Sequence, residues 1–495
     1  MRGCLGLMML LALGCGQTLA EKEPPTPTAD THVGAAARKG ASSATDTHAK
    51  GAVNEGALPV AEPRAGGVDW PGFLGPAGDS TSPEKGILSP WPEQGLRLVW
   101  KREVGEGYGM PSIARGRLLQ FERVGDKARL NCLNSTTGEL LWTFAYPTAY
   151  EDDFGYSNGP RCSPVIDDDR AYIYGAEGML HCLNVADGKL LWKVDTMRDF
   201  GVIKNFFGVG STPVIFNDLL LVHVGGSPPG SADEPFGALQ GNGSAVVAFD
   251  KLTGKVRYQT GDELASYAGP VLATIDGRPW CFQLARGGLL GFDPRDGKID
   301  FHFPWRADDL ASVNASNPVV AGDKVFITET YGPGSACVQV RPGGYKVLWT
   351  DENKPSRDKS LQGHWCTPIH HKGYLYGCSG RYQTNGELRC VELATGKVRW
   401  RKTGLGRTSL LMVDGHLLAL SETGLLVLLK VNPDKYEEIS RLDFADPDRP
   451  EYLGGTRFAL HHDPYWAAPI LSHGLLYVRG QQRLACFELI PRERD

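Results

Sequence analysis

A twelve-residue phrase that recurs along the chain limits its fold more than any other feature. "LNSTTGELLWTF" (Leu133–Phe144) and "LNVADGKLLWKV" (Leu183–Val194) are nearly identical. Further copies are Phe249–Thr260, Phe292–Phe303 and Val391–Lys402, with a weaker one at Val340–Asp351. Most copies have two apolar-rich arms around a Thr-Gly or Asp-Gly turn, where glycine tolerates the positive φ of a tight hairpin. The phrase therefore predicts a repeated β-hairpin whose second arm carries an aromatic residue: Trp142, Trp192, Tyr258, Phe301, Trp349 or Trp400.

A proline that precedes each phrase fixes the length of the repeat. It follows a small or polar residue and occurs at Pro111, Pro164, Pro213, Pro270, Pro318, Pro368 and Pro469. Successive gaps are 53, 49, 57, 48 and 50 residues, and the last gap of 101 spans two units. The unit without the proline is Thr408–Val431, which keeps the strand pattern. The chain therefore contains eight units of about 51 residues.

Each unit contains four short runs rich in β-branched and aromatic residues, bounded by Asp and Gly turns. Four-stranded units at this spacing are typical of β-propeller blades. A parallel β-solenoid is the rival fold, but it needs shorter coils. The last unit stops after three strands, and Leu96–Gly105, with Trp100 at the aromatic position, supplies a fourth. We predict an all-β, eight-bladed propeller of antiparallel blades over residues 67–495, closed by this N-terminal strand.

The N-terminus is typical of an export signal. Arg2 precedes the apolar stretch Leu5–Leu13, which is too short to span a bilayer. "ALGC" before Cys15 resembles a bacterial lipobox, although Ala12 and Leu13 depart from the usual pattern, and "TLA" ending at Ala20 would suit an ordinary signal peptidase. We expect a signal peptide over residues 1–20, with lipidation of Cys15, plain secretion or an uncleaved anchor as alternatives. Residues 21–66 are rich in Ala, Thr, Pro and Gly, which predicts a disordered linker.

Charge and hydropathy narrow the classes of partner. The formal net charge is -5, and the lysines and arginines form no run, which argues against nucleic acid. No segment after the signal is long and apolar enough for a transmembrane helix. We therefore expect an exported monomer, in the periplasm or held at the membrane by a lipid on Cys15.

The repeated "TGxxxW" phrase resembles the pyrroloquinoline-quinone (PQQ) repeat superfamily. That superfamily includes quinoprotein alcohol dehydrogenases and BamB-like outer-membrane assembly lipoproteins. "DWPGFLGPAGDSTSPEKGI" (Asp69–Ile87) and "LLVLLKVNPDKYEEISR" (Leu425–Arg441) are also similar to exported PQQ-like propellers of planctomycete-type bacteria. The resemblance covers nearly all of the chain after Gly66. It implies a propeller fold, and it says little about function because one fold serves many activities.

The resemblance to quinoproteins implies specific chemistry that this sequence lacks in part. Those enzymes place a vicinal cysteine disulfide and a tryptophan against PQQ, bind Ca²⁺ through carboxylate and amide oxygens, and use a catalytic aspartate. No two cysteines are adjacent here, and there is no C-x-x-C-H haem motif. Cofactors are therefore not expected, and PQQ with calcium remains the alternative. We find no nucleophile–base pair for a hydrolase and no metal-ligand spacing.

The cysteines are expected to serve packing. Cys132, Cys182, Cys390 and Cys486 share one position in the third strand, which predicts a small apolar residue between blades. Blade six adds Cys366 and Cys378, each twelve residues from the next cysteine. Hairpin arithmetic predicts that Cys366, Cys378 and Cys390 lie side by side, where one strained disulfide or a reactive or metal-binding cluster could form. Blade two would have the same row at Cys162, Tyr174 and Cys182, which favours core packing.

The loops before the innermost strands should converge on one mouth of the central channel. They contain aromatic, amide and arginine side chains, and carboxylates are scarce, Asp463 being the nearest. Such a mouth would hold a planar, sugar-like or anionic ligand, or an extended peptide. The alternative is that the aromatic residues plug the channel. Arg161 and Arg407 are the strongest candidates. The candidate site comprises Asn158, Arg161, Tyr267, Asn317, His364, Trp365, Arg407, Tyr465 and Trp466, with Tyr108, Phe207 and Asn314 beside them.

These observations predict a non-catalytic, exported propeller that binds an envelope protein or a small planar or anionic ligand. The alternative is a PQQ-dependent quinoprotein oxidoreductase similar to alcohol dehydrogenases. The missing cysteine pair and the scarcity of carboxylates in the loops favour the binding protein.

Overall fold

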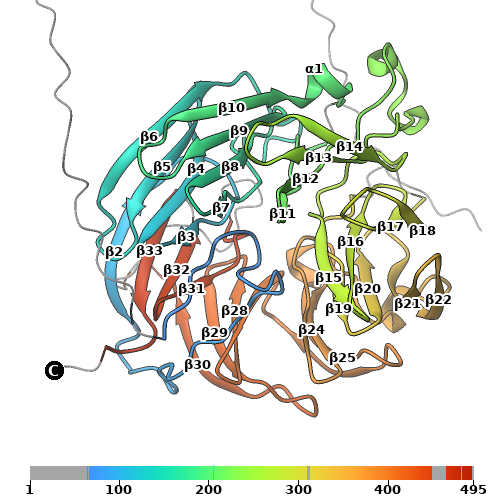
Figure 1. The fold of residues 1–495 in the computed structure, drawn as a ribbon. Helices are drawn as coiled ribbons and strands as arrows, with labels where there is room; N and C mark the ends of the chain where they lie inside the picture. Colours follow the sequence, from blue (N-terminus) through green and yellow to red (C-terminus); the bar gives the residue numbers. More distant parts are fainter. Residues whose placement is uncertain are drawn as a thin grey trace, which may run out of the picture. The chain divides into compact units, whose positions relative to one another are not determined.

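The structure, a computed structural model, describes residues 64–492 except 65, 204–205, 309–312, 447, 449–463 and 481. Pro59–Asp495 forms one compact unit. The predicted signal peptide, Cys15 and nearly all of the predicted linker lie outside the described residues, as does Asp463. In the described part of the chain the strands form eight sheets arranged around a ring, so the predicted eight-bladed propeller is confirmed (Figure 1).

The first four blades follow one another along the chain, and their innermost strands are short. Blade 1 consists of β3 (Ser112–Ala114), β4 (Arg117–Val124), β5 (Lys127–Asn134) and β6 (Leu140–Pro147). Blade 2 consists of β7 (Val165–Asp167), β8 (Arg170–Tyr174), β9 (Met179–Asn184) and β10 (Leu190–Asp195), followed by the short helix α1 (Thr196–Phe200). Blade 3 consists of β11 (Val214–Phe216), β12 (Leu219–His223), β13 (Val246–Asp250) and β14 (Val256–Thr260). Blade 4 consists of β15 (Val271–Ile275), β16 (Arg278–Leu284), β17 (Gly288–Phe292) and β18 (Ile299–Pro304).

The remaining blades complete the ring, and the last one takes a strand from the N-terminal side. Blade 5 consists of β19 (Val319–Ala321), β20 (Lys324–Glu329), β21 (Gly334–Arg341) and β22 (Gly344–Thr350). Blade 6 consists of β23 (Ile369–His371), β24 (Tyr374–Ser379), β25 (Glu387–Glu392) and β26 (Val398–Thr403). Blade 7 consists of β27 (Thr408–Val413), β28 (His416–Ser421), β29 (Leu425–Lys430) and β30 (Glu438–Asp443), with β1 (Thr81–Ser82) beside β27. Blade 8 consists of β31 (Ile470–Ser472), β32 (Leu475–Gly480), β33 (Arg483–Glu488) and β2 (Arg97–Glu103).

At five junctions the aromatic ring of one blade contacts the turn glycine of the next. The Trp142 ring of blade 1 lies over Gly188 in the β9–β10 turn of blade 2, and its Nε1 donates to the Val185 carbonyl at 2.9 Å. A Cβ on Gly188 would come within 2.5 Å of that ring. The same ring-on-glycine contact occurs between Trp100 and Gly138, Trp192 and Gly254, Tyr258 and Gly297, and Trp349 and Gly396. The Thr-Gly or Asp-Gly turn is therefore a docking site for the preceding blade as well as a hairpin turn.

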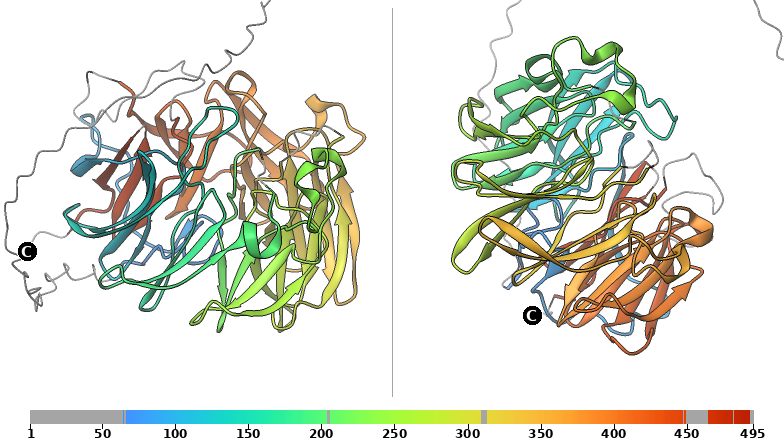
Figure 2. Two further views of the ribbon diagram at one scale, coloured as in Figure 1. Left: turned by 90° about the horizontal axis from the view of Figure 1, so that it is seen from above. Right: turned by 90° about the vertical axis from the view of Figure 1, so that its right-hand side faces the viewer.

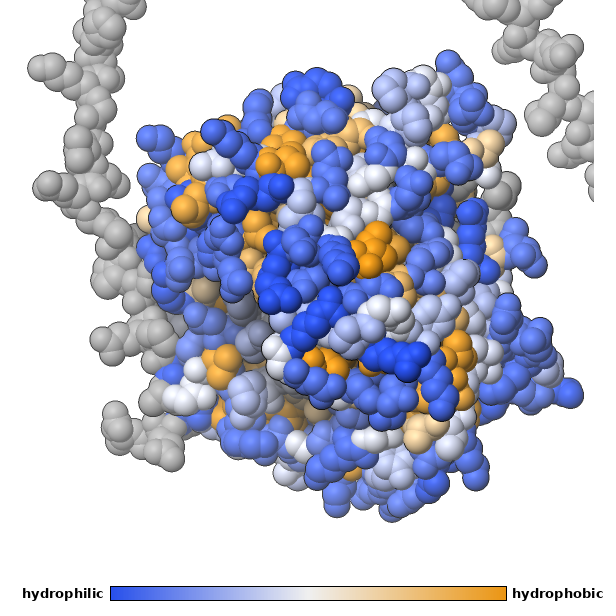
Figure 3. All heavy atoms as spheres, turned by 45° about the vertical axis from the view of Figure 1, so that its right-hand side comes forward, coloured by the Kyte–Doolittle hydropathy of each residue, from blue (hydrophilic) through white to orange (hydrophobic). Residues whose placement is uncertain are grey.

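Figure 2 shows the sheets from two further sides, and apolar side chains pack between neighbouring sheets. One cluster joins Tyr172 and Leu180 of blade 2 to Leu220 and Val247 of blade 3, and other clusters join other neighbouring blades in the same way. On the face drawn in Figure 3 hydrophilic side chains predominate, and apolar ones form small separate groups. The core of this protein therefore lies between blades, as the repeat requires.

Residues 68–87, which precede β2, lie along the innermost strands of several blades. The Trp70 and Ile113 backbones exchange hydrogen bonds, the Ile166 amide donates to the Pro71 carbonyl, and β1 runs parallel to β27. These contacts lie on the face of the propeller that carries the turns between the first and second strands of the blades. The opposite face, which carries the loops that enter the innermost strands, is called the loop face below.

The prediction that the cysteines of blade 6, and Cys162, Tyr174 and Cys182 of blade 2, lie side by side in rows is wrong. Cys390 lies opposite Tyr376, and Cys378 lies opposite Leu388. In blade 2 Cys182 likewise lies opposite Tyr172. The hairpin arithmetic placed the centre of the β24–β25 connection one residue too far along the chain. All nine described cysteines are free and buried.

Candidate functional site

The residue before four of the seven landmark prolines ties neighbouring loops of the loop face together. Ser163 Oγ accepts from the Met110 amide of the previous loop at 3.1 Å, and Thr212 Oγ1 accepts from the Ser163 amide at 3.1 Å. Asn317 Oδ1 accepts from the Gly269 amide at 2.8 Å. A small polar side chain at this position therefore links one blade to the next. Asn317, predicted as a ligand residue, has this structural role.

Trp466 lies at the junction of the aromatic side chains on the loop face. Its ring centroid is 4.8 Å from those of Tyr108 and Trp365, and 5.7 Å from that of Tyr156. Further contacts extend this aromatic cluster, which comprises Tyr108, Tyr156, Phe207, Tyr267, Tyr331, His364, Trp365 and Trp466. All eight side chains are half-buried. The loops entering six of the eight blades contribute to the cluster, so the predicted convergence of these loops is observed.

Both arginines singled out from the sequence are paired with carboxylates. Arg407 Nε lies 3.0 and 2.9 Å from the two oxygens of Glu422, and the guanidinium carbon lies 4.4 Å from the centroid of the Trp365 ring. Arg161 Nη2 lies 3.3 Å from Asp152 Oδ2, whose side chain is fully buried. These geometries match an arginine that has found its anion within the protein. Each guanidinium is therefore neutralised by a carboxylate of the protein, although Arg161 Nε and Nη2 make no hydrogen bond with the described residues.

Asn158, Tyr267 and His364 are half-buried and form hydrogen bonds within the protein. Asn158 Oδ1 accepts from the Asp152 amide at 2.8 Å, and the Tyr267 hydroxyl accepts from the Phe207 amide at 2.6 Å. His364 Nε2 lies 3.0 Å from the Tyr331 hydroxyl. Burial, together with the charges of Arg407 and Arg381, lowers the pKa of His364 to about 3, so its ring is neutral at neutral pH.

Tyr465 was predicted to lie at the mouth, but it belongs to the core. It is 2% exposed, and its ring packs against Gly424 and Gly480. Its hydroxyl donates to the Phe444 carbonyl at 3.3 Å. Consecutive residues of this loop therefore point to opposite sides, so that Trp466 reaches the aromatic cluster while Tyr465 fills the gap between blades 7 and 8.

Sequence reasoning missed the carboxylates of the loop face. Glu422 directly follows β28, in a turn between second and third strands, and Asp152 lies shortly before Tyr156, in the stretch between β6 and β7. Tyr331 also comes from a turn between second and third strands. These turns reach the same face as the loops before the innermost strands, so counting strand direction along the repeat would have found them.

Comparison with known proteins gives the family. The family model described as outer membrane protein assembly factor BamB matches residues 126–402, more than half of the chain. The chain belongs to this BamB family. None of the curated proteins matches the sequence.

Solved structures resemble the BamB-family chain in fold. The crystal structure of BamB from Moraxella catarrhalis has a TM-score of 0.53 at 14% identity, covering 81% of this chain and 99% of that one. Quinohemoprotein alcohol dehydrogenase from Comamonas testosteroni has a TM-score of 0.58 at 12% identity, covering 86% of this chain and 81% of that one. At these identities the likeness shows the propeller fold, which a BamB and a dehydrogenase share.

The polar groups of the loop face are a poor match to PQQ with calcium. Calcium prefers carboxylate and amide oxygens. Arg407 and Arg161 already hold Glu422 and Asp152, while the Asn317 and Asn158 oxygens accept backbone amides. The described residues bring together no cluster of three side chains suited to a metal ion. Among them we also find no helix with the length and apolar character needed to cross a bilayer.

Proposed function

We propose that this chain is a non-catalytic binding protein of the cell envelope, and that its loop face holds a protein partner. The observation that carries the proposal is the aromatic cluster around Trp466. Its members are half-exposed, come from seven of the eight blades and are connected by ring contacts. Tyrosine, tryptophan and arginine in such clusters are the residues that contribute most to protein–protein binding.

The pairing of the arginines supports a protein partner over a small anion. Glu422 and Asp152 neutralise Arg407 and Arg161 within the protein. A ligand that relied on these guanidinium groups would have to displace a buried carboxylate, which is costly. Aromatic faces and amide edges need no such displacement, and a partner that covers several loops at once can use all of them.

Location at the envelope rests on the family and on the N-terminal sequence. The family model is named for the outer membrane protein assembly factor BamB, and one similar structure is a BamB. The expected export signal over residues 1–20 would carry the chain out of the cytoplasm, and lipidation of Cys15 would hold it at a membrane.

Photocrosslinking in cells tests the proposal directly. We would place a photoreactive phenylalanine analogue at Phe154, which is 51% exposed beside the aromatic cluster, and at Leu252, which is 52% exposed in the β13–β14 turn. We expect a discrete crosslinked protein from position 154 that is lost when Trp466 is changed to Ala, and none from position 252. Crosslinking from both positions alike, or from neither, would contradict a partner on the loop face.

Thermal unfolding with PQQ and Ca²⁺ tests the quinoprotein alternative. A ligand present at a hundred times its dissociation constant stabilises the folded state by about 2.7 kcal/mol. We expect no shift of the midpoint with the full exported protein. A shift that disappears in Arg407→Ala would instead support a PQQ-dependent oxidoreductase.

A further inference from the structure

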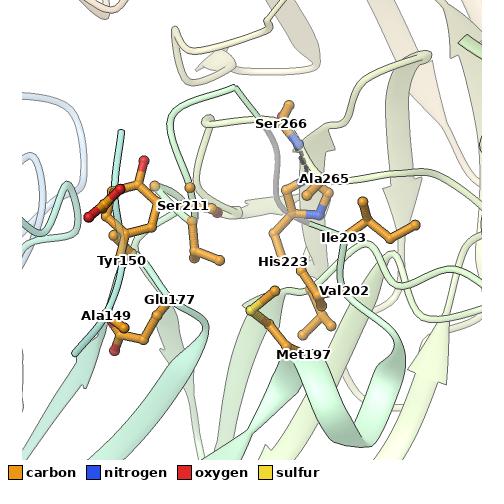
Figure 4. A pocket seen from close by; sticks show the side chains of 16 residues that line it. Ala149, Tyr150, Glu177, Met197, Val202, Ile203, Ser211, His223, Ala265 and Ser266 are labelled. Atoms are coloured by element: carbon orange, nitrogen blue, oxygen red, sulfur yellow. Dashed lines mark hydrogen bonds between the residues drawn. The ribbon is translucent and has the colours of Figure 1, made fainter. Parts of the chain in front are cut away.

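A second candidate site lies beside the aromatic cluster, between blades 2 and 3. It is a pocket of about 420 Å³, within the range of small-molecule sites. Figure 4 shows Tyr150 and Glu177 on one side of it, and His223, Met197 and Val202 on the other. Aliphatic side chains dominate its walls, including Val202, Val209 and Val224.

The pocket is distinct from the aromatic cluster but shares a wall with it. Gly210 lines the pocket, and its Cα packs so closely against the Tyr267 ring that a Cβ would lie 2.5 Å away. Tyr150 also lines the pocket, and the Arg161 guanidinium lies 5.2 Å from the centroid of its ring. The pocket therefore lies behind the side chains that form one edge of the loop face.

The charged groups of the pocket are acidic. Glu151 and Glu177 line it, and no lysine or arginine occurs among the described residues that do so. Glu177 Oε1 accepts from the Tyr146 hydroxyl at 2.6 Å, and Oε2 accepts from Thr148 Oγ1 at 3.1 Å. Each carboxylate oxygen has a second lone pair, so Glu177 can accept further hydrogen bonds.

His223 contributes no positive charge to the pocket. The Ser266 amide donates to its Nε2 at 2.9 Å, so Nε2 carries no proton. Nδ1 therefore holds the proton and donates to the Ala245 carbonyl at 2.7 Å. Burial lowers the pKa of His223 to about 4, so the ring stays neutral at neutral pH.

We propose that this pocket binds a small apolar amine, with its hydrocarbon body against Val202, Val209 and Val224 and its ammonium group directed to Glu177. An ammonium donates three hydrogen bonds and carries the charge that a partly desolvated carboxylate favours. A carboxylate ligand of the same shape would be repelled by Glu151 and Glu177. This inference goes beyond the proposed function, because it assigns a second site with a ligand of a different class.

Isothermal titration of the full exported protein with three matched probes tests the assignment. The probes are phenethylamine, phenethyl alcohol and 3-phenylpropionate, which share a phenyl group and differ in charge. We expect phenethylamine to bind most tightly and 3-phenylpropionate not to bind. Glu177→Gln should weaken phenethylamine binding about tenfold, the loss of one charge-assisted hydrogen bond, and leave the alcohol unchanged.

Variants whose new side chains fill the pocket distinguish amine binding in the pocket from binding at the loop face. Ala265→Phe and Ala149→Trp, at two different walls, should each abolish phenethylamine binding while the unfolding midpoint shows that the protein is folded. Ala149 is exposed at the rim, so its replacement spares the core. Trp466→Ala should leave phenethylamine binding unchanged. The assignment is overturned if both filled variants still bind the amine, if 3-phenylpropionate binds as tightly, or if Trp466→Ala alone removes binding.

Discussion

The small residue opposite each fourth-strand aromatic ring is a requirement of the repeat. Cys132, Cys182, Cys337, Cys390 and Cys486 each lie directly opposite a tryptophan on the neighbouring strand. Where cysteine is absent, Ala248 lies opposite Tyr258 and Gly291 opposite Phe301. A Cβ on Gly291 would lie 2.3 Å from the Phe301 ring, so space at this position is limiting. The cysteines therefore serve as small apolar side chains. Burial raises the pKa of Cys182 to about 11, which keeps the thiol protonated.

Replacing Cys182 tests this packing argument at the scale of one residue. We expect Cys182→Ala to cost about 1 kcal/mol of unfolding free energy, because it deletes one buried atom. Cys182→Leu should cost about 1–3 kcal/mol, because the added methyl groups displace the Trp192 ring. The measurement is the midpoint of denaturant unfolding for both variants. Equal midpoints for Ala and Leu would show that space opposite Trp192 is not limiting.

At the scale of the blade, the recurring phrase combines two functions that the sequence shows as one pattern. The glycine of the turn permits the positive φ of the hairpin, and it also leaves room for the aromatic ring of the preceding blade. In every blade the register between third and fourth strands shifts near the aromatic position, a bulge that bends the outer strand.

Two glycines with nearly the same φ angle allow the two functions to be tested separately. Gly188 has φ 73° and lies beneath the Trp142 ring, whereas Gly277 has φ 75°, and a Cβ there would meet no atom within 4 Å. Gly277→Ala should cost about 1 kcal/mol, the backbone strain alone. Gly188→Ala should cost at least about 1 kcal/mol more, because the new methyl group displaces Trp142. Thermal unfolding of both variants measures the difference, and equal losses would exclude a docking role for Gly188.

The fold was predictable to the level of the blade because its signals are local. Strand patterns recur in each unit, and turn glycines and landmark prolines recur in most of them, so their period gave the number of blades. The contacts between units were not predictable in the same way. The position of Trp142 over Gly188 depends on the next blade, and the true register of Cys378 depends on a connection that the hairpin arithmetic did not describe.

The candidate site was predictable in location but not in chemistry. The loops before the innermost strands meet as expected, since their place in the repeat fixes the face. The carboxylate that pairs with Arg407 is Glu422, in a turn between second and third strands, and the one that pairs with Arg161 is Asp152, early in the stretch between β6 and β7. Loop composition alone therefore predicted an anion site, whereas neighbouring segments of the same face already supply the anions.

At the scale of the whole molecule, the segment before β2 connects the two ends of the propeller chain. His473, in the turn after β31, lies 2.9 Å from Asp69 Oδ1, and the Gly474 amide donates to Glu84 at 2.7 Å. The hydrogen bond to Asp69 raises the pKa of His473. Burial alone would raise the pKa of Asp69, but hydrogen bonds from His473 and the Arg115 amide outweigh it and lower that pKa.

These opposite shifts predict a pH dependence for the joined ends. The pKa of His473 is higher in the folded state, so its contribution to stability is full below the unfolded value of about 6.5 and is lost as the pH rises through the folded value. The contribution of Asp69 is lost only as the pH falls below about 3.8, through its lowered pKa. We therefore expect His473→Gln to lower the unfolding midpoint more at pH 5.5 than at pH 9. His371 is the matched control, because burial lowers its pKa, and the effect of His371→Gln should change with pH in the opposite direction. A His473→Gln effect that is the same at both pH values would show that the His473–Asp69 contact does not depend on charge.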